Sequence, residues 1–381
     1  MEKLRKIEIT PGGEVTGENF FNREKEFQMF KKRLGSIQHI IISQVRRTGK
    51  TSFLKEFINR NPNLPIIYVI IQGCQNEGDF YKEIYKQTIK HCKNEKALEY
   101  IKKKWNIITE IVPEIKGVKL GQVLEKMEQI VDKLENIFQK EEFILFIDEF
   151  PDFLINLKER ENIQSFLGRF RDFRNECTKL NTILTGSINI YRTVTKLGLS
   201  DKLNEYRNFE FPLFSKNMSL LLFRCLLYSK DYILEKEVQK FILPYIEDGM
   251  PYFIQLLADE VIKINPKEKK IDINILKNVI RNFYKQDEFG LEEFHNRLKK
   301  YLKDENLEKP ARIILSHLST DAMTFDDLYP YVDDLISKEK LNELLNRLID
   351  EAYVKKADDK YTFLSKLLAG WWKEKKHFDR R

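Results

Sequence analysis

The sequence predicts an α/β fold in which helices cover both faces of a parallel sheet, followed by a helical region and a small C-terminal unit. Three observations support this prediction. Short apolar runs alternate with amphipathic helical patterns in the first half of the chain. From about residue 215 to residue 300, every segment reads as a helix. Glycine (15 residues) and proline (11 residues) are scarce in a chain of 381, which disfavours a turn-rich all-β protein.

Four apolar runs in the first half are predicted to be strands, and they cover residues 39–43, 65–71, 143–147 and 181–186. Runs of this kind are typical of strands buried on both faces, which occur in parallel sheets with helical crossovers. The predicted crossover helices cover residues 50–60, 79–104, 122–140 and 160–176. Residues 106–121 read as a loop or a β-type excursion.

The second half is predicted to be mainly helical, with helices at residues 215–228, 232–246, 251–264, 271–285 and 290–302. Two more helices follow at 310–318 and 339–351, and Thr324 can cap a short helix between them. A hairpin around the polar turn 357–360 completes the chain. Helices followed by such a hairpin predict a winged helix. The predicted domains are therefore an α/β core at 1–214, a helical domain at 215–304 and a winged helix at 305–381.

Composition excludes several classes of protein. No apolar run approaches the roughly 20 residues of a membrane span, and the charged start Met-Glu-Lys-Leu-Arg lacks the apolar centre of a signal peptide. Four separated cysteines and five histidines show no metal-type spacing. We therefore expect a cytoplasmic protein with reduced thiols. The net charge of +7 permits a polyanionic partner but does not require one.

A candidate phosphate-binding turn follows the first predicted strand. Residues 43–51 read Ser-Gln-Val-Arg-Arg-Thr-Gly-Lys-Thr and lead into a helix. A helix N-terminus preceded by a glycine-lysine turn is the expected place for a P-loop, because free backbone N–H groups bind phosphate. Lys50 would reach the β- and γ-phosphates, and the Thr51 hydroxyl would ligate Mg²⁺. Gln44 stands where the usual pattern has its first glycine, so weaker nucleotide binding is an open alternative.

Two acidic residues follow the third predicted strand. Residues 143–147 (Phe-Ile-Leu-Phe-Ile) are apolar, and Asp148 and Glu149 come directly after them. A buried parallel strand delivers such carboxylates to the edge where α/β sheets bind ligands. Asp148 would hold Mg²⁺ through water, and Glu149 would orient and deprotonate the attacking water. The competing interpretation is two ordinary acids at a strand end.

These motifs resemble those of the archaeal-type ATPases of the STAND branch of the AAA+ superfamily. Residues 20–26 (Phe-Phe-Asn-Arg-Glu-Lys-Glu) resemble that group's N-terminal element, with Asn22 where glycine is usual. Residues 46–52 (Arg-Arg-Thr-Gly-Lys-Thr-Ser) resemble its form of the P-loop. Residues 184–187 (Leu-Thr-Gly-Ser) resemble its fourth strand, and residues 248–252 (Asp-Gly-Met-Pro-Tyr) resemble the glycine-proline element of its helical lid. The likeness spans nearly the whole chain, including the winged helix.

The resemblance implies ATP and Mg²⁺ as ligands and a function for each matched residue. The phosphate-binding residues would be Arg46, Arg47, Thr48, Gly49, Lys50, Thr51 and Ser52. Phe21, Arg23 and Pro251 would lie near the base, and Ser187 would stand at the sensor position. Strand-end capping by Ser187, a surface pair at Arg23 and a plain helix boundary at Pro251 are the simpler alternatives.

An arginine finger would stabilise charge on the transferring phosphoryl group. Arg207 falls where the family usually has an arginine after the sensor. Arg169, Arg171 and Arg174 on the predicted helix 160–176 are further candidates. For each single arginine, an ordinary solvated side chain is the simpler interpretation.

The charge distribution bears on DNA binding. Residues 301–381 carry a net charge of −1, whereas residues 1–213 carry +6. Because binding to phosphate backbones needs clustered Lys and Arg, the near-neutral winged helix disfavours DNA without excluding it. Trp371 and Trp372 are either a docking spot or part of the last helix's packing.

The expected function is an ATP-binding and ATP-hydrolysing switch whose nucleotide state controls the orientation of the lid and winged helix and the binding of a partner. That partner would be another protein or a second copy of the chain. Two alternatives stay open: a DNA-associated ATPase that uses the winged helix, and a nucleotide-binding scaffold with little hydrolysis. Gln44 and Asn22 support the scaffold, and the intact Lys50 and Glu149 oppose it.

Overall fold

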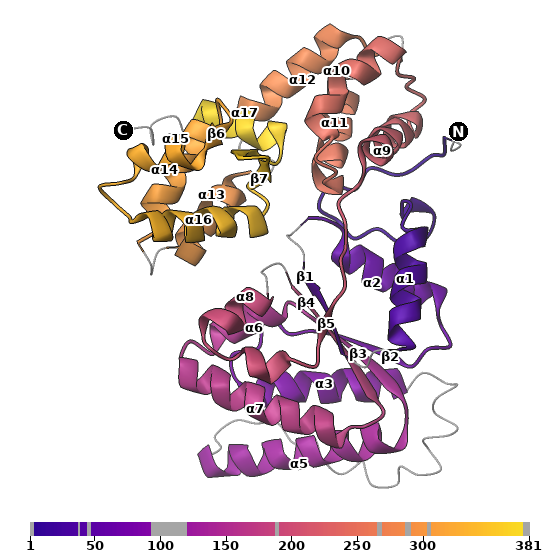
Figure 1. Cartoon of the computed structure of the whole chain (residues 1–381). Helices are drawn as coiled ribbons and strands as arrows, with labels where there is room; N and C mark the ends of the chain where they lie inside the picture. Colours follow the sequence, from indigo (N-terminus) through magenta and orange to yellow (C-terminus); the bar gives the residue numbers. More distant parts are fainter. Residues whose placement is uncertain are drawn as a thin grey trace. The chain divides into compact units, whose positions relative to one another are not determined.

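Five parallel strands form one sheet, in the order β2-β3-β4-β1-β5 (Figure 1). Their bounds are β1 His39–Ser43, β2 Ile66–Ile70, β3 Phe143–Asp148, β4 Leu180–Gly186 and β5 Arg207–Asn208. The four strands predicted from apolar runs are thereby confirmed to within a residue at each end. The parallel sheet with helical crossovers is confirmed as well.

The computed structural model describes residues 4–36, 39–43, 47–92, 120–186, 190–264, 269–285, 291–302 and 306–375. The chain forms two compact units. The sheet unit consists of Arg23–Arg46 and Phe57–Phe211, and the helical unit of Met1–Asn22, Arg47–Glu56 and Pro212–Arg381. Helix α2 (Lys50–Arg60) contributes Lys50–Glu56 to the helical unit and Phe57–Arg60 to the sheet unit.

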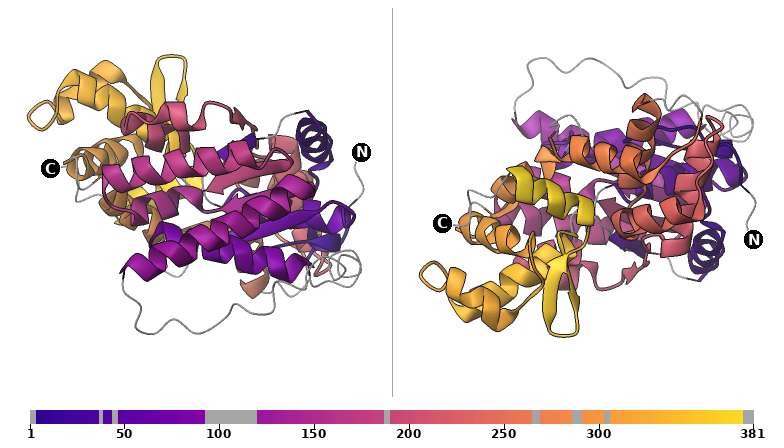
Figure 2. Two further views of the ribbon diagram at one scale, coloured as in Figure 1. Left: turned by 90° about the horizontal axis from the view of Figure 1, so that it is seen from below. Right: turned by 90° about the horizontal axis from the view of Figure 1, so that it is seen from above.

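Helices cover both faces of the sheet, as predicted. On one face, α1 (Glu24–Leu34) and the end of α2 pack on β3, where the Phe57 and Phe146 ring centroids are 6.3 Å apart. On the other face lie α3 (Glu77–Cys92), α5 (Leu120–Lys140) and α7 (Arg160–Glu176) (Figures 1 and 2). Two short helices, α6 (Phe150–Asn156) and α8 (Ile190–Lys196), belong to this second layer.

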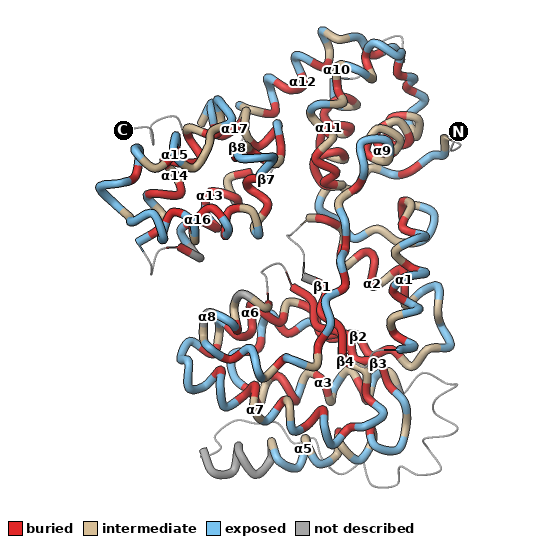
Figure 3. The backbone as a smooth tube through the Cα atoms, viewed as in Figure 1, coloured by how far each residue is buried: buried red, intermediate tan, exposed pale blue. Residues whose placement is uncertain are grey.

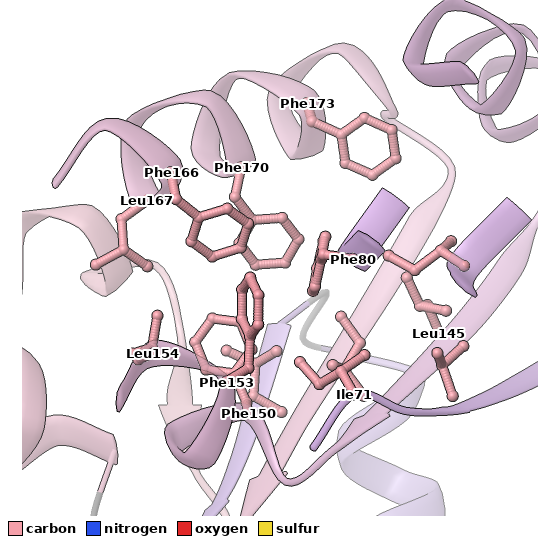
Figure 4. Close-up of a cluster of buried hydrophobic side chains, with 14 of the residues drawn as sticks. Ile71, Phe80, Leu145, Phe150, Phe153, Leu154, Phe166, Leu167, Phe170 and Phe173 are labelled. Atoms are coloured by element: carbon pink, nitrogen blue, oxygen red, sulfur yellow. The ribbon is translucent and has the colours of Figure 1, made fainter. Parts of the chain in front are cut away.

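Aromatic side chains fill the second layer. Phe80 of α3 lies between α6 and α7, with its ring centroid 5.2 Å from that of Phe153 and 4.9 Å from that of Phe166 (Figure 4). Phe166 and Phe170 stack one turn apart on α7 at 5.6 Å. Edge-to-face and offset-stacked pairs add about 0.5–1.5 kcal/mol each beyond burial. Beneath them, β3 is buried along its whole length and β4 at every residue but Asn181 (Figure 3).

The helical unit contains the helices predicted after residue 215. They are α9 Lys216–Tyr228, α10 Lys236–Ile246, α11 Pro251–Ile264, α12 Ile273–Lys285 and α13 Glu292–Leu302. Helix α10 begins at Lys236 rather than at the predicted residue 232. Residues 231–235 include Asp231, whose φ of 65° is not helical.

The last part of the helical unit combines helices with a three-stranded antiparallel sheet in the order β6-β8-β7. Its elements are α14 Glu308–Leu318, β6 Met323–Thr324, α15 Phe325–Leu328, α16 Lys338–Asp350, β7 Val354–Ala357, β8 Lys360–Phe363 and α17 Lys366–Lys375. Thr324 caps α15 through a reciprocal capping box with Asp327, as the sequence predicts. The hairpin β7-β8 is also confirmed.

Trp371 and Trp372 are fully buried, so their interpretation as an exposed docking spot is wrong. The Trp372 ring packs against His295 of α13 and Phe363 of β8, with centroids 5.7 and 6.0 Å away. The two side chains are therefore core of the C-terminal part.

Other sequence predictions have mixed outcomes. Helices α1, α6 and α8 were not predicted. Residues 93–119 lie outside the described residues. They include the end of the predicted helix 79–104 and most of the predicted loop 106–121. Residues 120–121 of that predicted loop belong instead to α5. Cys74, Cys177 and Cys225 are buried, and none of the three forms a disulfide. No helix in the described part of the chain is long and apolar enough to cross a bilayer.

Gly186 at the end of β4 is required by a close approach. A Cβ on Gly186 would lie 2.2 Å from Cδ of Pro151, in the first turn of α6. This contact places the start of α6, and with it Glu149, against the end of β4. Gly168 in the middle of α7 is a matched contrast, because a Cβ there would meet nothing within 4 Å.

We expect Gly186→Ala to lower the free energy of unfolding by about 2–3 kcal/mol, because either Pro151 or the backbone must move. We expect Gly168→Ala to raise it by about 0.5–1 kcal/mol, because alanine favours helix. Urea denaturation followed by circular dichroism measures both. A Gly186→Ala protein as stable as wild type would contradict the close contact.

Candidate functional site

The candidate site lies at the carboxyl edge of the parallel sheet. Ser43 at the end of β1 pairs with Gly186 at the end of β4, and β3, on the other side of β4, ends at Asp148. The chain leaves β1 through α2 and leaves β4 through α8, whose Ile190 and Val194 pack in the opposite layer. Ligands bind beyond the carboxyl ends of parallel strands where neighbouring crossovers leave to opposite faces.

The turn before α2 has the backbone of an anion-binding loop. Arg47 has a φ of 67° and Gly49 a φ of 91°, both in the left-handed region. Lys50 and Thr51 open α2, and the Phe53 N–H already donates to the Gly49 carbonyl at 2.9 Å. Alternating left- and right-handed backbone turns N–H groups inward as a nest for anions. Thr48, Lys50 and Ser52 are buried.

Three residues that the sequence analysis discusses lie outside the described residues: Gln44, Arg46 and Ser187. Phosphate binding by Arg46, the sensor function of Ser187 and the effect of Gln44 on nucleotide binding therefore stay predictions.

The N-terminal segment runs along α2 and α11. The Val15 N–H donates to Oγ of Ser52 at 3.1 Å, and the Gly17 N–H donates to Oε2 of Glu56 at 2.7 Å. The Thr10 N–H donates to Oε1 of Gln255 on α11 at 2.7 Å. Ser52 thus binds this segment, an interaction that the resemblance did not predict.

Arg47 stacks on Tyr252 of α11. The guanidinium carbon lies 3.8 Å from the ring centroid, well within cation–π range. Tyr252 follows Pro251, the first residue of α11, so the glycine-proline element stands next to the candidate phosphate-binding turn within the helical unit. Sequence reasoning missed this contact, because the two residues are 205 positions apart.

Asp148 and Glu149 stand at the end of β3 as predicted. Asp148 is 4 % exposed; its Oδ2 accepts a hydrogen bond from the Tyr68 hydroxyl at 2.5 Å, and its Oδ1 accepts one from the Glu149 N–H at 3.0 Å. Glu149 has a φ of 60°, directly before α6. Non-glycine residues in this region cost about 1–3 kcal/mol and cluster at functional sites.

By their chemistry, two candidate ligands suit Mg²⁺. Asp148 of the sheet unit offers a carboxylate and Thr51 of the helical unit a hydroxyl, and both are hard oxygen donors. Among the described residues, no group of three or more His, Cys, Asp or Glu could hold a metal by itself. Mg²⁺ usually binds through one or two carboxylates plus substrate phosphates rather than in an all-protein cage.

Phe21 and Arg23 are both buried. The Phe21 ring meets Phe214 edge-on at 5.7 Å in the helical unit. Arg23, in the sheet unit, pairs with Glu26 at 3.0 Å and lies 4.5 Å over the Phe211 ring. Burial lowers the pKa of Arg23. The surface-pair interpretation of Arg23 is therefore wrong.

The candidate finger arginines Arg169, Arg174 and Arg207 all belong to the sheet unit. Nε of Arg169 donates to Oε1 of Glu77 at 2.7 Å. Arg174 is buried, pairs with Glu205 and lies 4.5 Å over the Phe170 ring, so it cannot reach another molecule. Arg207 is exposed on β5, but it pairs in register with Ile40, about 10 Å before the carboxyl end of β1. The register does not bring Arg207 to the candidate site.

Comparisons with known proteins agree with this architecture. No family model and no curated protein matches the sequence. Among solved structures, the Walker-type ATPase PABY2304 of Pyrococcus abyssi is similar at a TM-score of 0.59 and 18 % identity, covering 96 % of this chain and 98 % of that one. The ORC2 protein of Aeropyrum pernix is similar at a TM-score of 0.55 and 12 % identity, covering 94 % and 96 %.

The chain has the fold of a Walker-type ATPase. At these identities the likeness shows the fold alone. In this Walker-type fold, β4 separates β1 from β3, so the candidate phosphate-binding turn and the acidic pair follow strands two apart in one sheet.

Asp248 opens the glycine-proline element and is buried. Its Oδ1 accepts a hydrogen bond from the Met250 N–H at 3.0 Å. Burial raises the pKa of Asp248 from 3.8 to about 6. The Met250 N–H, Ser365 and Lys355 oppose this rise, because they favour the charged carboxylate. Gly249, with a φ of 75°, follows Asp248 and has no side chain that could cover the carboxyl.

Because the pKa of Asp248 is higher in the folded state, the protonated carboxyl stabilises the fold below about pH 4, and this stabilisation is lost as the pH rises through about 6. Asp248→Asn keeps the acceptor oxygen and removes the charge. We expect it to raise the free energy of unfolding by about 1–3 kcal/mol at pH 7.5 and by less at pH 4.5. Urea denaturation at both pH values measures this.

Asp272→Asn is the matched control. Asp272 is exposed and accepts a hydrogen bond from the Ile275 N–H at 2.8 Å. The free energy of unfolding of Asp272→Asn should therefore stay within about 0.5 kcal/mol of the wild-type value. An Asp248→Asn protein that gains no stability at pH 7.5 would show that the buried charge carries no cost.

Proposed function

We propose that this chain is an ATP-binding and ATP-hydrolysing switch of the AAA+ class, of the STAND branch that its motifs resemble. One observation carries the proposal: the turn that opens α2 follows β1 in the chain, the acidic pair ends β3, and β1 and β3 are strands of one parallel sheet whose carboxyl ends point the same way. The similar ORC2 protein was solved as ADPNP and ADP complexes, which supports a nucleotide as the ligand.

The phosphates would bind at the start of α2. Backbone N–H groups of Thr48, Gly49 and Lys50 and the positive end of the helix favour anions. The Lys50 ammonium would neutralise the β- and γ-phosphates. Arg46, Arg47 and Ser52 complete the proposed phosphate-binding residues. Phe21, Arg23 and Pro251 are proposed to lie near the base.

Hydrolysis would use the groups at the end of β3. Bound Mg²⁺, held by Thr51 and through water by Asp148, would neutralise charge on the phosphates. Glu149 would take a proton from a water molecule whose oxygen attacks the γ-phosphorus, and the bond to the β-phosphate oxygen would break to release ADP. Ser187 is the proposed sensor residue. Arg207, which its register keeps away from the site of its own chain, is proposed as a finger only toward the site of a second copy.

The proposal includes a three-domain organisation: a core at 1–214, a lid at 215–304 and a winged helix at 305–381. The order α14, β6, α15, α16, β7, β8 with its small antiparallel sheet supports the winged helix. Nucleotide state would control the lid and winged helix and thereby the binding of a protein partner or a second copy in the cytoplasm. The net charge of −1 in residues 301–381 disfavours DNA as that partner.

We expect Lys50→Ala to weaken ATP binding by roughly 30- to 150-fold, because charged hydrogen bonds to phosphate contribute about 2–3 kcal/mol. Titration with a fluorescent ATP analogue measures this. Lys86→Ala, on the exposed face of α3, is the matched control and should bind as wild type does. Equal affinity of the Lys50→Ala and wild-type proteins would refute the phosphate site.

Glu149→Gln should keep ATP binding and lose about 10²- to 10⁴-fold in turnover, because it removes the general base. Phosphate release measures turnover, and Glu161→Gln on the exposed side of α7 is the control. Unchanged turnover would remove Glu149 as the general base, whereas a wild-type protein that binds ATP and releases no phosphate would be a nucleotide-binding scaffold. The Glu149→Gln protein held on ATP is also the bait for a partner, and its captured protein and nucleic acid should be analysed separately.

A further inference from the structure

Tyr68 on β2 hydrogen-bonds to the acidic end of β3. Its hydroxyl donates to Oδ2 of Asp148 at 2.5 Å. The strands are parallel, with Tyr68 opposite Phe146 and Ile70 opposite Asp148. Because side chains alternate along a strand, Tyr68, Phe146 and Asp148 share the face that α1 and the end of α2 cover. Tyr68 therefore reaches Asp148 diagonally across two neighbouring strands.

Both oxygens of the Asp148 carboxylate accept hydrogen bonds. Tyr68 donates to Oδ2 from the neighbouring strand, and the Glu149 N–H donates to Oδ1 from the residue that follows. With Asp148 only 4 % exposed, few other orientations are open to it. The N–H contact is part of the chain's own turn, whereas Tyr68 holds the carboxylate by a side chain from another strand.

We propose that Tyr68 is a positioning residue for Mg²⁺ binding, which holds the Asp148 carboxylate toward the metal's coordinated water. This inference rests on the proposed function. Carboxylates that serve a metal are themselves hydrogen-bonded, and removing such a partner typically costs 10- to 100-fold in metal affinity. Tyr68 neither touches the nucleotide nor moves a proton in this proposal.

The alternative is that Tyr68 only stabilises the sheet. It lies on an edge strand and is partly exposed, so its ring contributes to packing in either case. Tyr68→Phe separates the two possibilities, because it keeps the ring and removes only the hydroxyl. A packing function would leave Mg²⁺ affinity as it is.

The test is the Mg²⁺ dependence of nucleotide binding in the full chain. A fluorescent ATP analogue is titrated at a series of Mg²⁺ concentrations and again with EDTA. For Tyr68→Phe we expect about a 10-fold higher half-saturating Mg²⁺ concentration and unchanged affinity in EDTA. Tyr85→Phe on α3 removes a hydroxyl from the same unit and should match wild type.

A double-mutant cycle shows whether Tyr68 acts through Asp148. Asp148→Asn should raise the half-saturating Mg²⁺ concentration by itself, and adding Tyr68→Phe should raise it no further. Thermal melts of every variant check that the fold is intact. Equal Mg²⁺ dependence of Tyr68→Phe and wild type, or additive effects in the cycle, would overturn the inference while the proposed function stands. A wild-type protein that binds no nucleotide would overturn both.

Discussion

The burial of β3 on both faces is the constraint on which the candidate site depends. All six residues of this strand are buried, between β2 and β4 in the sheet. Leu145 and Ile147 pack in the aromatic layer of α3, α6 and α7, and Phe146 packs toward α1 and α2. A buried carboxylate without partners costs several kcal/mol, so the first acid comes only where the strand ends and donors are available. Asp148 meets this condition through Tyr68 and its own turn.

The same constraint explains how much of the fold could be predicted. A strand such as β3 is apolar at every position, and its acidic end marks where it leaves the core, so local sequence sufficed. Helix α6 could not be found in this way, because its seven residues (Phe-Pro-Asp-Phe-Leu-Ile-Asn) are too few to show a helical period. The start of α6 depends on the close packing of Pro151 against Gly186, which has no side chain, and this contact joins two separate parts of the chain.

The residues of the candidate site also fall into those that local sequence predicts and those that depend on tertiary contacts. Lys50, Thr51, Asp148 and Glu149 could be predicted because each follows an apolar run in a recognisable order. Tyr68 could not, because its contact with Asp148 depends on the register of β2 against β3. The Arg47–Tyr252 stack likewise depends on tertiary packing. Arg174 looked like a surface cation in its helical pattern, and only the fold shows it buried beside Glu205.

The helical unit is assembled from three separate stretches of chain, and this affects synthesis. The sheet unit is complete once Phe211 has emerged, whereas residues 4–22 and 47–56 then still lack their partners on α9 and α11. Tyr252 follows Phe211 by 41 residues, so at about 5–20 residues per second it emerges roughly 2–8 s later. During that interval the turn that opens α2 has no Tyr252 against Arg47. A nascent chain of this length therefore holds every residue of the sheet unit, but not the Tyr252 ring that packs on Arg47 in the candidate phosphate-binding turn.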